Sequence, residues 1–502
     1  MVENTPVPHR FPVEIAWDPL PWRYWNEETA AHLLRRLSFA STPEAVSKAV
    51  RARRTIEVAI DDAFREAEPL EMSEELLAYK NGVHEAYMEI YKGGLSDEAK
   101  RKRQQELRRE DEELFKNFAM SWFDHARQPQ NSAQEKFVLF LQDVFVVQRR
   151  NVRMTPLLFS LQEVLREGIG LSYPELCKRV SREPAMIQYL NLGQSTKKDP
   201  NENFARELFE LFTLGEGNYS EKDIKESARA FTGYRVQRRT EFFYQPALHD
   251  NDSKTVFGEK GNWDGDDVID ITFRQPAART FLIRELIKFY LTTDAVPEAY
   301  IEELGDRWAN HGFDLKYLIQ TFFQSRIFFH PAYRGNLVKS PVQFYLGLCQ
   351  DLKLDVVPFE SRLIRSMSAM GQAFYDPPNV RGWLYGEHWI NSTTITARRQ
   401  LVDYLFANLN EKRLNGNQMR TLKAVREMGK DKFLVEPERL LQLLEINHSE
   451  IARHLTTYLI TARSRATYQA VLEDIIQSTA QPERGLRYAV IALLQSPAYN
   501  LC

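Results

Sequence analysis

Two glutamates one helical turn apart, Glu207 and Glu210, are the first residues whose types and spacing suggest chemistry. In the segment 202–214, ENFARELFELFTL, they share one helix face with Asn203 and Arg206, at i, i+3, i+4 and i+7. A narrow polar stripe on an otherwise apolar helix indicates a face directed at something polar. The two carboxylates can coordinate a cation or act as general acid and base, with Asn203 and Arg206 as binding groups. The alternative is a structural network, in which Arg206 pairs with a glutamate and Asn203 caps the helix.

An adjacent histidine and aspartate, His249 and Asp250, form the second candidate, and Lys254 follows them closely. Such a pair binds metal in some helical phosphohydrolases. Those enzymes also need histidines at upstream helical positions, and the upstream histidines of this chain follow no such pattern. The residues therefore predict either a divalent metal held by His249 and Asp250, with Lys254 as a nearby binding group, or an ordinary turn.

The third candidate is the segment 377–389, PPNVRGWLYGEHW. Its aromatic residues Trp383, Tyr385 and Trp389 can form a platform for sugars, because aromatic faces suit the apolar faces of sugar rings. Asn379 adds a polar group to the same segment. A tryptophan-rich loop can equally be a packing plug, and both interpretations stay open.

Other signals for chemistry are weak. The acidic cluster at 264–267 resembles a calcium loop, but the twelve-residue EF-hand spacing and its closing glutamate are absent. The sequence holds no P-loop, dinucleotide fingerprint or Gly-x-Ser-x-Gly elbow. Its three cysteines, Cys177, Cys349 and Cys502, are far apart and form neither a metal-ligand spacing nor a disulfide framework, so we expect a reducing compartment.

The composition describes a globular chain. Of its 502 residues, 43% are hydrophobic and 27% are charged, which excludes a disordered protein. The net charge of −3 argues against nucleic-acid binding by bulk electrostatics. The longest apolar stretch, 137–147, is interrupted by polar residues and too short to span a bilayer. No signal peptide is evident, so we expect a cytoplasmic protein, or an exported one if a signal was removed.

The elements that must position these residues are mostly helices. We predict a mainly α, multi-helix globular protein with long ordered loops, one of them over 375–391. Ser220 and Asp223 predict a capping box at the start of a helix. The pattern then changes to two short strands, 234–236 and 241–244, which predict a small β-hairpin insertion near 234–245. The segment 254–265, with three glycines, is predicted to be a loop.

The chain is predicted to form one helical domain over 1–502 with three distinguishable regions. The highly charged segment 71–113 predicts a solvated helical hairpin. The central motif region is 201–270 and contains the β-hairpin. Residues 400–502 form a C-terminal helical subdomain.

Several stretches together resemble one bacterial family, the domain-of-unknown-function 1800 proteins. The resemblance covers nearly the whole chain, and its most specific stretches are Asn201–Tyr234 and Pro377–Arg399. The other matching stretches are Ala31–Pro43, Glu183–Asn191, His249–Asp270, Arg334–Phe344 and the closing LLQSPAYNLC. The family has no settled activity. The resemblance implies a context, because members are often encoded beside sulfatase-like proteins of the domain-of-unknown-function 1501 family, many of them exported.

One departure from the family pattern bears on function. Relatives usually show a Trp-His-Asn-His-Phe run, where this chain has Leu141, Gln142, Asp143, Val144 and Phe145. Both histidines are absent, which favours a binding or scaffold module that acts with a sulfatase-like partner or a glycan. The alternative is a metal-assisted hydrolase that uses Glu207, Glu210, His249 and Asp250.

Overall fold

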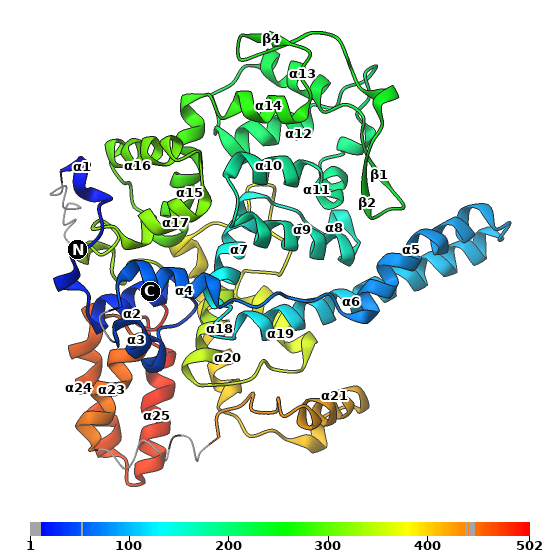
Figure 1. Cartoon of the computed structure of the whole chain (residues 1–502). Helices are drawn as coiled ribbons and strands as arrows, with labels where there is room; N and C mark the ends of the chain where they lie inside the picture. The colour runs from blue at the N-terminus through cyan, green and yellow to red at the C-terminus, as the bar shows by residue number, and fades with distance from the viewer. Residues whose placement is uncertain (1–11, 52–53, 437–439, 441–446) are drawn as a thin grey trace.

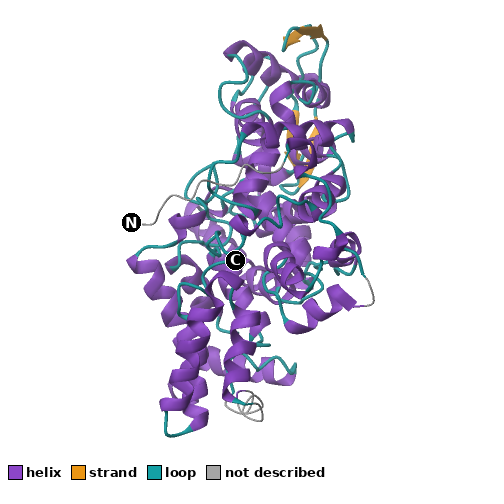
Figure 2. Ribbon diagram, turned by 90° about the vertical axis from the view of Figure 1, so that its left-hand side faces the viewer, coloured by secondary structure: helices purple, strands orange, loops and turns teal. Residues whose placement is uncertain are grey.

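Helices make up most of the chain, as predicted, in a computed structural model that describes residues 12–51, 54–436, 440 and 447–502. The only strands in this described part form two small antiparallel pairs, which lie at the upper end of the molecule in Figure 2. No helix among the described residues is long and apolar enough to cross a membrane.

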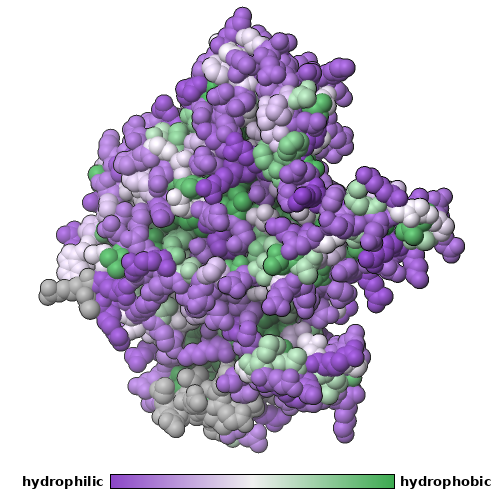
Figure 3. Space-filling view, turned by 45° about the vertical axis from the view of Figure 1, so that its right-hand side comes forward, coloured by the Kyte–Doolittle hydropathy of each residue, from purple (hydrophilic) through white to green (hydrophobic). Residues whose placement is uncertain are grey.

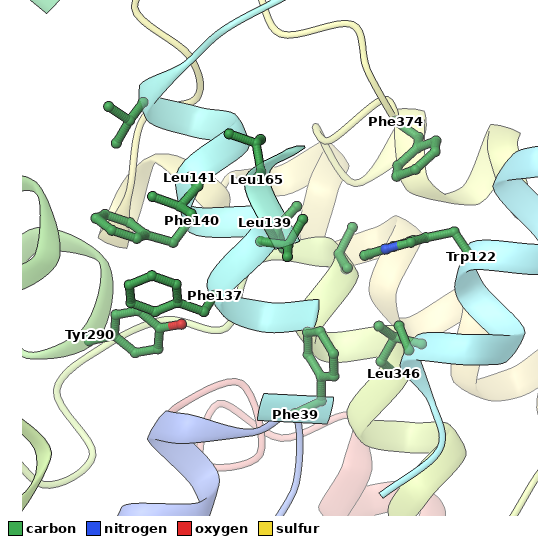
Figure 4. Packing of buried hydrophobic residues seen from close by; sticks show 14 of the residues in the cluster. Phe39, Trp122, Phe137, Leu139, Phe140, Leu141, Leu165, Tyr290, Leu346 and Phe374 are labelled. Carbon is green, nitrogen blue, oxygen red and sulfur yellow. The ribbon is translucent and has the colours of Figure 1, made fainter. Parts of the chain in front are cut away.

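The helix α7 (Ser132–Val144) runs through the centre of the core. Residues on every side of it are buried, from Ser132 and Ala133 to Val144, and this is why its sequence is apolar with little helical period. Figure 4 shows Phe137, Leu139 and Phe140 of α7 among side chains from distant parts of the chain. The elements packed around it are α2 (Glu27–Leu37), α4 (Ile56–Arg65), α6 (Asp97–Ala126), α9 (Thr155–Gly168) and α15 (Phe281–Tyr290).

A long helical hairpin, α5 (Glu74–Lys92) with α6, projects from this body (Figures 1 and 3). The charged hairpin was predicted to end at residue 113, but α6 continues to Ala126. Its second half carries Leu114, Phe118 and Trp122 into the core, so one helix is solvated at its start and buried at its end. The face seen in Figure 3 is mostly hydrophilic, with apolar side chains in small separate patches.

The central region holds both strand pairs. The predicted hairpin is confirmed as β1 (Tyr234–Gln237) and β2 (Glu241–Tyr244), which pair Tyr234 with Tyr244. The prediction of a loop over 254–265 was wrong, because β3 (Lys254–Val256) pairs with β4 (Glu259–Gly261). The Phe257–Gly258 turn between them has positive φ at both residues, as a tight hairpin turn requires. The helices of this region are α12 (Asn203–Glu207), α13 (Glu221–Ala230) and α14 (Gly265–Thr272), and those just before it in the chain are α8 (Arg149–Val152), α10 (Tyr173–Ser181) and α11 (Pro184–Tyr189).

The predicted helix 202–214 is interrupted. Its first part is α12, and its second part, η4 (Leu208–Thr213), has π-helical geometry. A π turn bonds i to i+5 instead of i to i+4, so it rotates the side chains that follow it away from the α-helical stripe. The helix after it, α13, begins at the predicted capping box of Ser220 and Asp223.

The remaining helices complete the body and its lower end. In Figure 1 α24 and α25 lie beside α23, below the N-terminal helices, and their pairwise contacts are extensive. Part of the predicted 400–502 subdomain, residues 437–439 and 441–446, lies outside the described residues. The elements not yet given are α1 (Val13–Ala16), α3 (Pro43–Val50), α16 (Glu298–Asn310), α17 (Leu315–Gln324), α18 (Pro341–Asp351), α19 (Glu360–Ala369), α20 (Ser392–Leu405), α21 (Gly416–Glu427), α23 (His448–Leu459), α24 (Arg465–Ser478) and α25 (Pro482–Leu494).

Candidate functional site

A cavity of about 820 Å³ opens where five segments meet. They are the end of α7, η4 with the turn after it, α15 with the residues that follow it, the segment 336–338, and the loop 380–388, which includes most of the single turn η8 (Gly386–Trp389). The volume falls within the range of about 300–1,000 Å³ usual for small-molecule sites. Six carboxyl side chains line the cavity, from Asp143, Glu210, Glu216, Glu285, Asp294 and Glu387. Lys288 and Arg381 are the cations of its described lining, so the site is acidic.

Asp143 sits at the inner wall and is 8% exposed. Its Oδ1 accepts a hydrogen bond from the backbone N–H of Trp383 at 2.8 Å, and its Oδ2 accepts one from the Tyr385 hydroxyl. Burial raises the pKa of Asp143 well above its ordinary value, and Glu285 raises it further, while the Trp383 bond lowers it. Asp143 therefore holds its proton more strongly than an ordinary aspartate does.

The loop can approach Asp143 this closely because Gly382 has no side chain. A Cβ at that position would overlap the Asp143 carboxylate. The φ of Gly382 is +77°, which favours glycine on its own account. Gly382 thus allows the loop to pack against the end of α7.

Glu210 points to the cavity from the π turn. It accepts a hydrogen bond from Tyr219 at 2.7 Å, and it pairs with Arg381 of the loop at 2.9 Å. Arg381 also pairs with Glu216. These contacts tie the loop to the region after η4 across a sequence separation of 171 residues.

On the opposite side, α15 presents Glu285 and Lys288 to the cavity, paired at 2.7 Å across one turn. Both are partly exposed, so the pair contributes little to stability. Its contribution is to place a carboxylate and an ammonium group at the same wall.

The other residues of the predicted polar stripe have different contacts. Arg206 pairs with glutamates, as the structural-network alternative predicts, and these are Glu221 and Glu202. The exposed side chain of Asn203 does not cap α12. Burial, and next the charge of Glu210, raise the pKa of the half-buried Glu207. Arg381 acts on Glu207 as well and lowers its pKa, so Glu207 lies near the Glu210–Arg381 pair.

His249, Asp250 and Lys254 lie outside the lining of the cavity. Asp250 pairs with Arg229 at 2.7 Å, and the His249 ring lies 2.9 Å from the carbonyl oxygen of Thr232. The fully buried Lys254 donates to the carbonyl of Asp250 at 2.6 Å. Within the described part of the chain, no three His, Cys, Asp or Glu side chains are grouped so that they could hold a metal ion.

The aromatic residues of the loop are more enclosed than a sugar platform requires. Trp383 and Trp389 are 8% and 5% exposed, and only Tyr385 is half-buried. Trp383 and Tyr385 line the cavity, whereas Trp389 lies behind it. The exposed Asn379 accepts from the backbone of Arg381 and shapes the turn before Gly382.

The acidic cluster at 264–267 has a local explanation. Asp264 caps α14 and accepts from the backbone N–H groups of Asp266 and Asp267, and Asp266 pairs with Arg182. These are the contacts of a helix start.

A family model for proteins of unknown function, DUF1800, matches residues 32–501. The chain belongs to the DUF1800 family. Its cavity is therefore built almost entirely from the part of the chain that the family model covers. Searches of curated proteins and of solved structures returned no match.

Sequence reasoning missed several residues of the site. Asp143 interrupts an apolar stretch and replaces a residue of the family run, but neither feature led to its prediction as a site residue. Glu285 and Lys288 look like an ordinary i,i+3 surface pair. Arg381 lies within a predicted loop, and no local pattern indicates that it reaches Glu210.

Proposed function

We propose that this protein binds a carbohydrate in the cavity between α7, α15 and the loop 380–388. The observation that supports this most strongly is the convergence of carboxyl groups and aromatic side chains on one cavity of ligand size. Carboxylates accept hydrogen bonds from hydroxyl groups, and apolar ring surfaces such as those of Tyr385 and Phe281 suit the apolar faces of sugars.

The charge of the cavity limits the classes of ligand that it can bind. Six carboxyl groups against one lysine and one arginine disfavour a ligand with carboxylate, sulfate or phosphate groups. We therefore propose a neutral or amino sugar. The sulfatase-like partner implied by the family is a separate proposal. Its proposed contact is with Val380 and Leu384, two exposed apolar residues at the cavity.

A second candidate function, hydrolysis of a glycosidic bond, is favoured by Asp143 alone. A carboxyl with a raised pKa can act as a general acid, and Glu285 or Glu210 at the same cavity can act as its basic counterpart. In this mechanism a carboxylate takes a proton from water, and the water oxygen bonds to the anomeric carbon. The bond from that carbon to the glycosidic oxygen breaks as Asp143 gives its proton to this oxygen, so the leaving group departs as an alcohol. The earlier metal-assisted alternative remains a prediction, but His249 and Asp250 are outside this cavity.

Carbohydrate binding is tested by saturation-transfer NMR against a panel of neutral, amino and sulfated oligosaccharides. Glu285→Gln removes one cavity carboxylate and keeps the shape of the side chain. Glu113→Gln is a matched control, because Glu113 on α6 also pairs with a lysine three residues on, at 2.8 Å, away from the cavity. Binding that Glu285→Gln weakens and Glu113→Gln leaves unchanged supports the proposal, and a wild type that binds no member of the panel contradicts it. Release of reducing ends that Asp143→Asn abolishes would support hydrolysis in addition.

A further inference from the structure

A second, narrower chamber of about 30 Å³ lies behind the wall formed by Trp383 and Tyr385. It shares Asp143, Lys288 and that wall with the larger cavity. The groups that distinguish it are Arg36 of α2, Lys136 of α7, Gln343 of α18 and Cys502. This space is more than the about 10–15 Å³ that one water molecule needs by the same measure, so a chloride-sized ion fits in the chamber.

The chamber lies in an unusually cationic part of the core. Five positively charged side chains are each at most 5% exposed: Arg35, Arg36, Lys136, Lys339 and Arg398. After burial, the charges of neighbouring cations also lower the pKa values within this group. Arg36 lowers the pKa of Arg35 and of Lys136, and Arg35 and Arg398 lower that of Lys339, so these side chains form one cluster. Burial of so many like charges is costly unless anions compensate them.

The hydrogen bonds of these cations go mostly to neutral oxygens. Arg36 donates to the carbonyl of Tyr290 at 3.1 Å and to that of Tyr333 at 2.7 Å. Lys136 donates to the carbonyl of Ser38 at 2.7 Å. Arg398 likewise donates to the carbonyl of Lys339 at 2.9 Å. Carbonyl oxygens satisfy the donors, but they leave the charge uncompensated.

Three acidic groups lie at the chamber or near the cluster, and one of them is Asp143 of the chamber lining. Asp351 accepts a hydrogen bond from Tyr499 at 2.9 Å, and burial raises the pKa of this carboxyl. Burial acts to raise the pKa of the Cys502 thiol as well, but Arg36, Lys136 and Lys339 lower it below its ordinary value. Three acidic groups, of which Asp143 and Asp351 have raised pKa values, do not balance five cations. Burial accordingly lowers the pKa of Lys136 to about 7 and that of Lys339 to about 8.

We propose that the chamber between Arg36, Lys136 and Cys502 binds one monatomic anion of the size of chloride. An independent observation points to an occupant, because the Nε of Arg36 is buried without a hydrogen-bond partner and Arg36 is 1% exposed. The chamber adjoins the proposed carbohydrate cavity and shares a wall with it, but the anion site does not depend on carbohydrate binding.

The direct test is diffraction from crystals of the full chain soaked in sodium bromide, at a wavelength where bromine scatters anomalously. We expect an anomalous peak within hydrogen-bond reach of Arg36 and Lys136. A chamber without such a peak, or one filled by a carboxylate of the protein itself, would overturn the proposal.

Thermal unfolding gives a second test in solution. Replacing sodium gluconate by sodium chloride at constant ionic strength should raise the melting temperature of the wild type by about 1–3 °C, with saturation. Lys136→Met should lose this rise, and Lys102→Met, on the exposed start of α6, should keep it. An equal rise in both variants, or none in the wild type, would contradict the site. The bromide experiment uses only the wild type, so it decides the question even if Lys136→Met fails to fold.

Discussion

Replacing Glu135 by glutamine should be among the most damaging conservative changes in this protein. Glu135 lies on α7, the helix that presents Lys136 and Asp143, and its carboxylate is fully buried. It pairs with Arg166 of α9 through contacts of 2.7 and 3.0 Å, and it accepts from the Trp122 indole of α6 at 2.7 Å. One carboxylate thus holds three helices together.

The expected loss of stability follows from the negative charge of the Glu135 carboxylate. Burial acts to raise the pKa of Glu135, but the neighbouring His125 ring and the Arg166 guanidinium outweigh it and lower the pKa to about 2. Against an ordinary value of about 4.5, this corresponds to about 3 kcal/mol of stability. Glu135→Gln also leaves Arg166 buried beside a neutral group, for which about 3–5 kcal/mol is typical. The two arguments agree on a loss of about 3–4 kcal/mol.

The assay is urea unfolding followed by circular dichroism, with Glu113→Gln as the exposed control. Because the folded pKa lies below the unfolded one, the stabilisation should be complete above about pH 4.5 and should be lost as the pH falls toward 2. Glu135→Gln should flatten that part of the pH profile. A loss below about 1 kcal/mol, or an unchanged acid limb, would refute the reasoning.

Three further substitutions test other parts of the account. Asp143→Asn keeps the hydrogen bond from the Trp383 backbone and removes the ionisable group. Because the pKa of Asp143 is raised in the folded state, the stability of the wild type relative to this variant should fall as the pH rises above about 4. Parallel stability profiles of the two proteins against pH would contradict this. Glu207→Ala should cost less than about 1 kcal/mol, since Arg206 pairs with Glu221 and Glu202, and a loss above 2 kcal/mol on urea unfolding would show an overlooked network. Trp383→Ala should destabilise by about 3–5 kcal/mol, because this side chain is buried, and an unchanged melting temperature would mean that the loop packs differently.

The sequence could predict what local rules decide. The Ser220–Asp223 capping box and the β1–β2 hairpin were both predicted correctly, because helix caps and short alternating strands depend on neighbouring residues. The π turn of η4 was not predicted, because the residues of 208–213 are good helix formers and the sequence gives no local signal for a π turn. The β3–β4 pair was missed for the opposite reason, because its glycines were interpreted only as loop formers.

The candidate site was predicted only in part. Glu210, Trp383 and Tyr385 were named from the sequence and do line the cavity. Asp143 was missed as a site residue, because a polar residue within an apolar stretch gives no sign of the segment that will cover it. Glu285 was missed because its partner is a local lysine and its cavity is made by tertiary packing.

The most direct test of the central claim is isothermal titration of the purified protein with the best oligosaccharide from the NMR panel, repeated on Glu285→Gln and Glu113→Gln. The account predicts one saturable site for a neutral or amino sugar, with affinity at least tenfold lower in Glu285→Gln and unchanged in Glu113→Gln. Equal affinity in all three proteins would place the ligand elsewhere, and no heat of binding to any oligosaccharide would contradict the carbohydrate proposal.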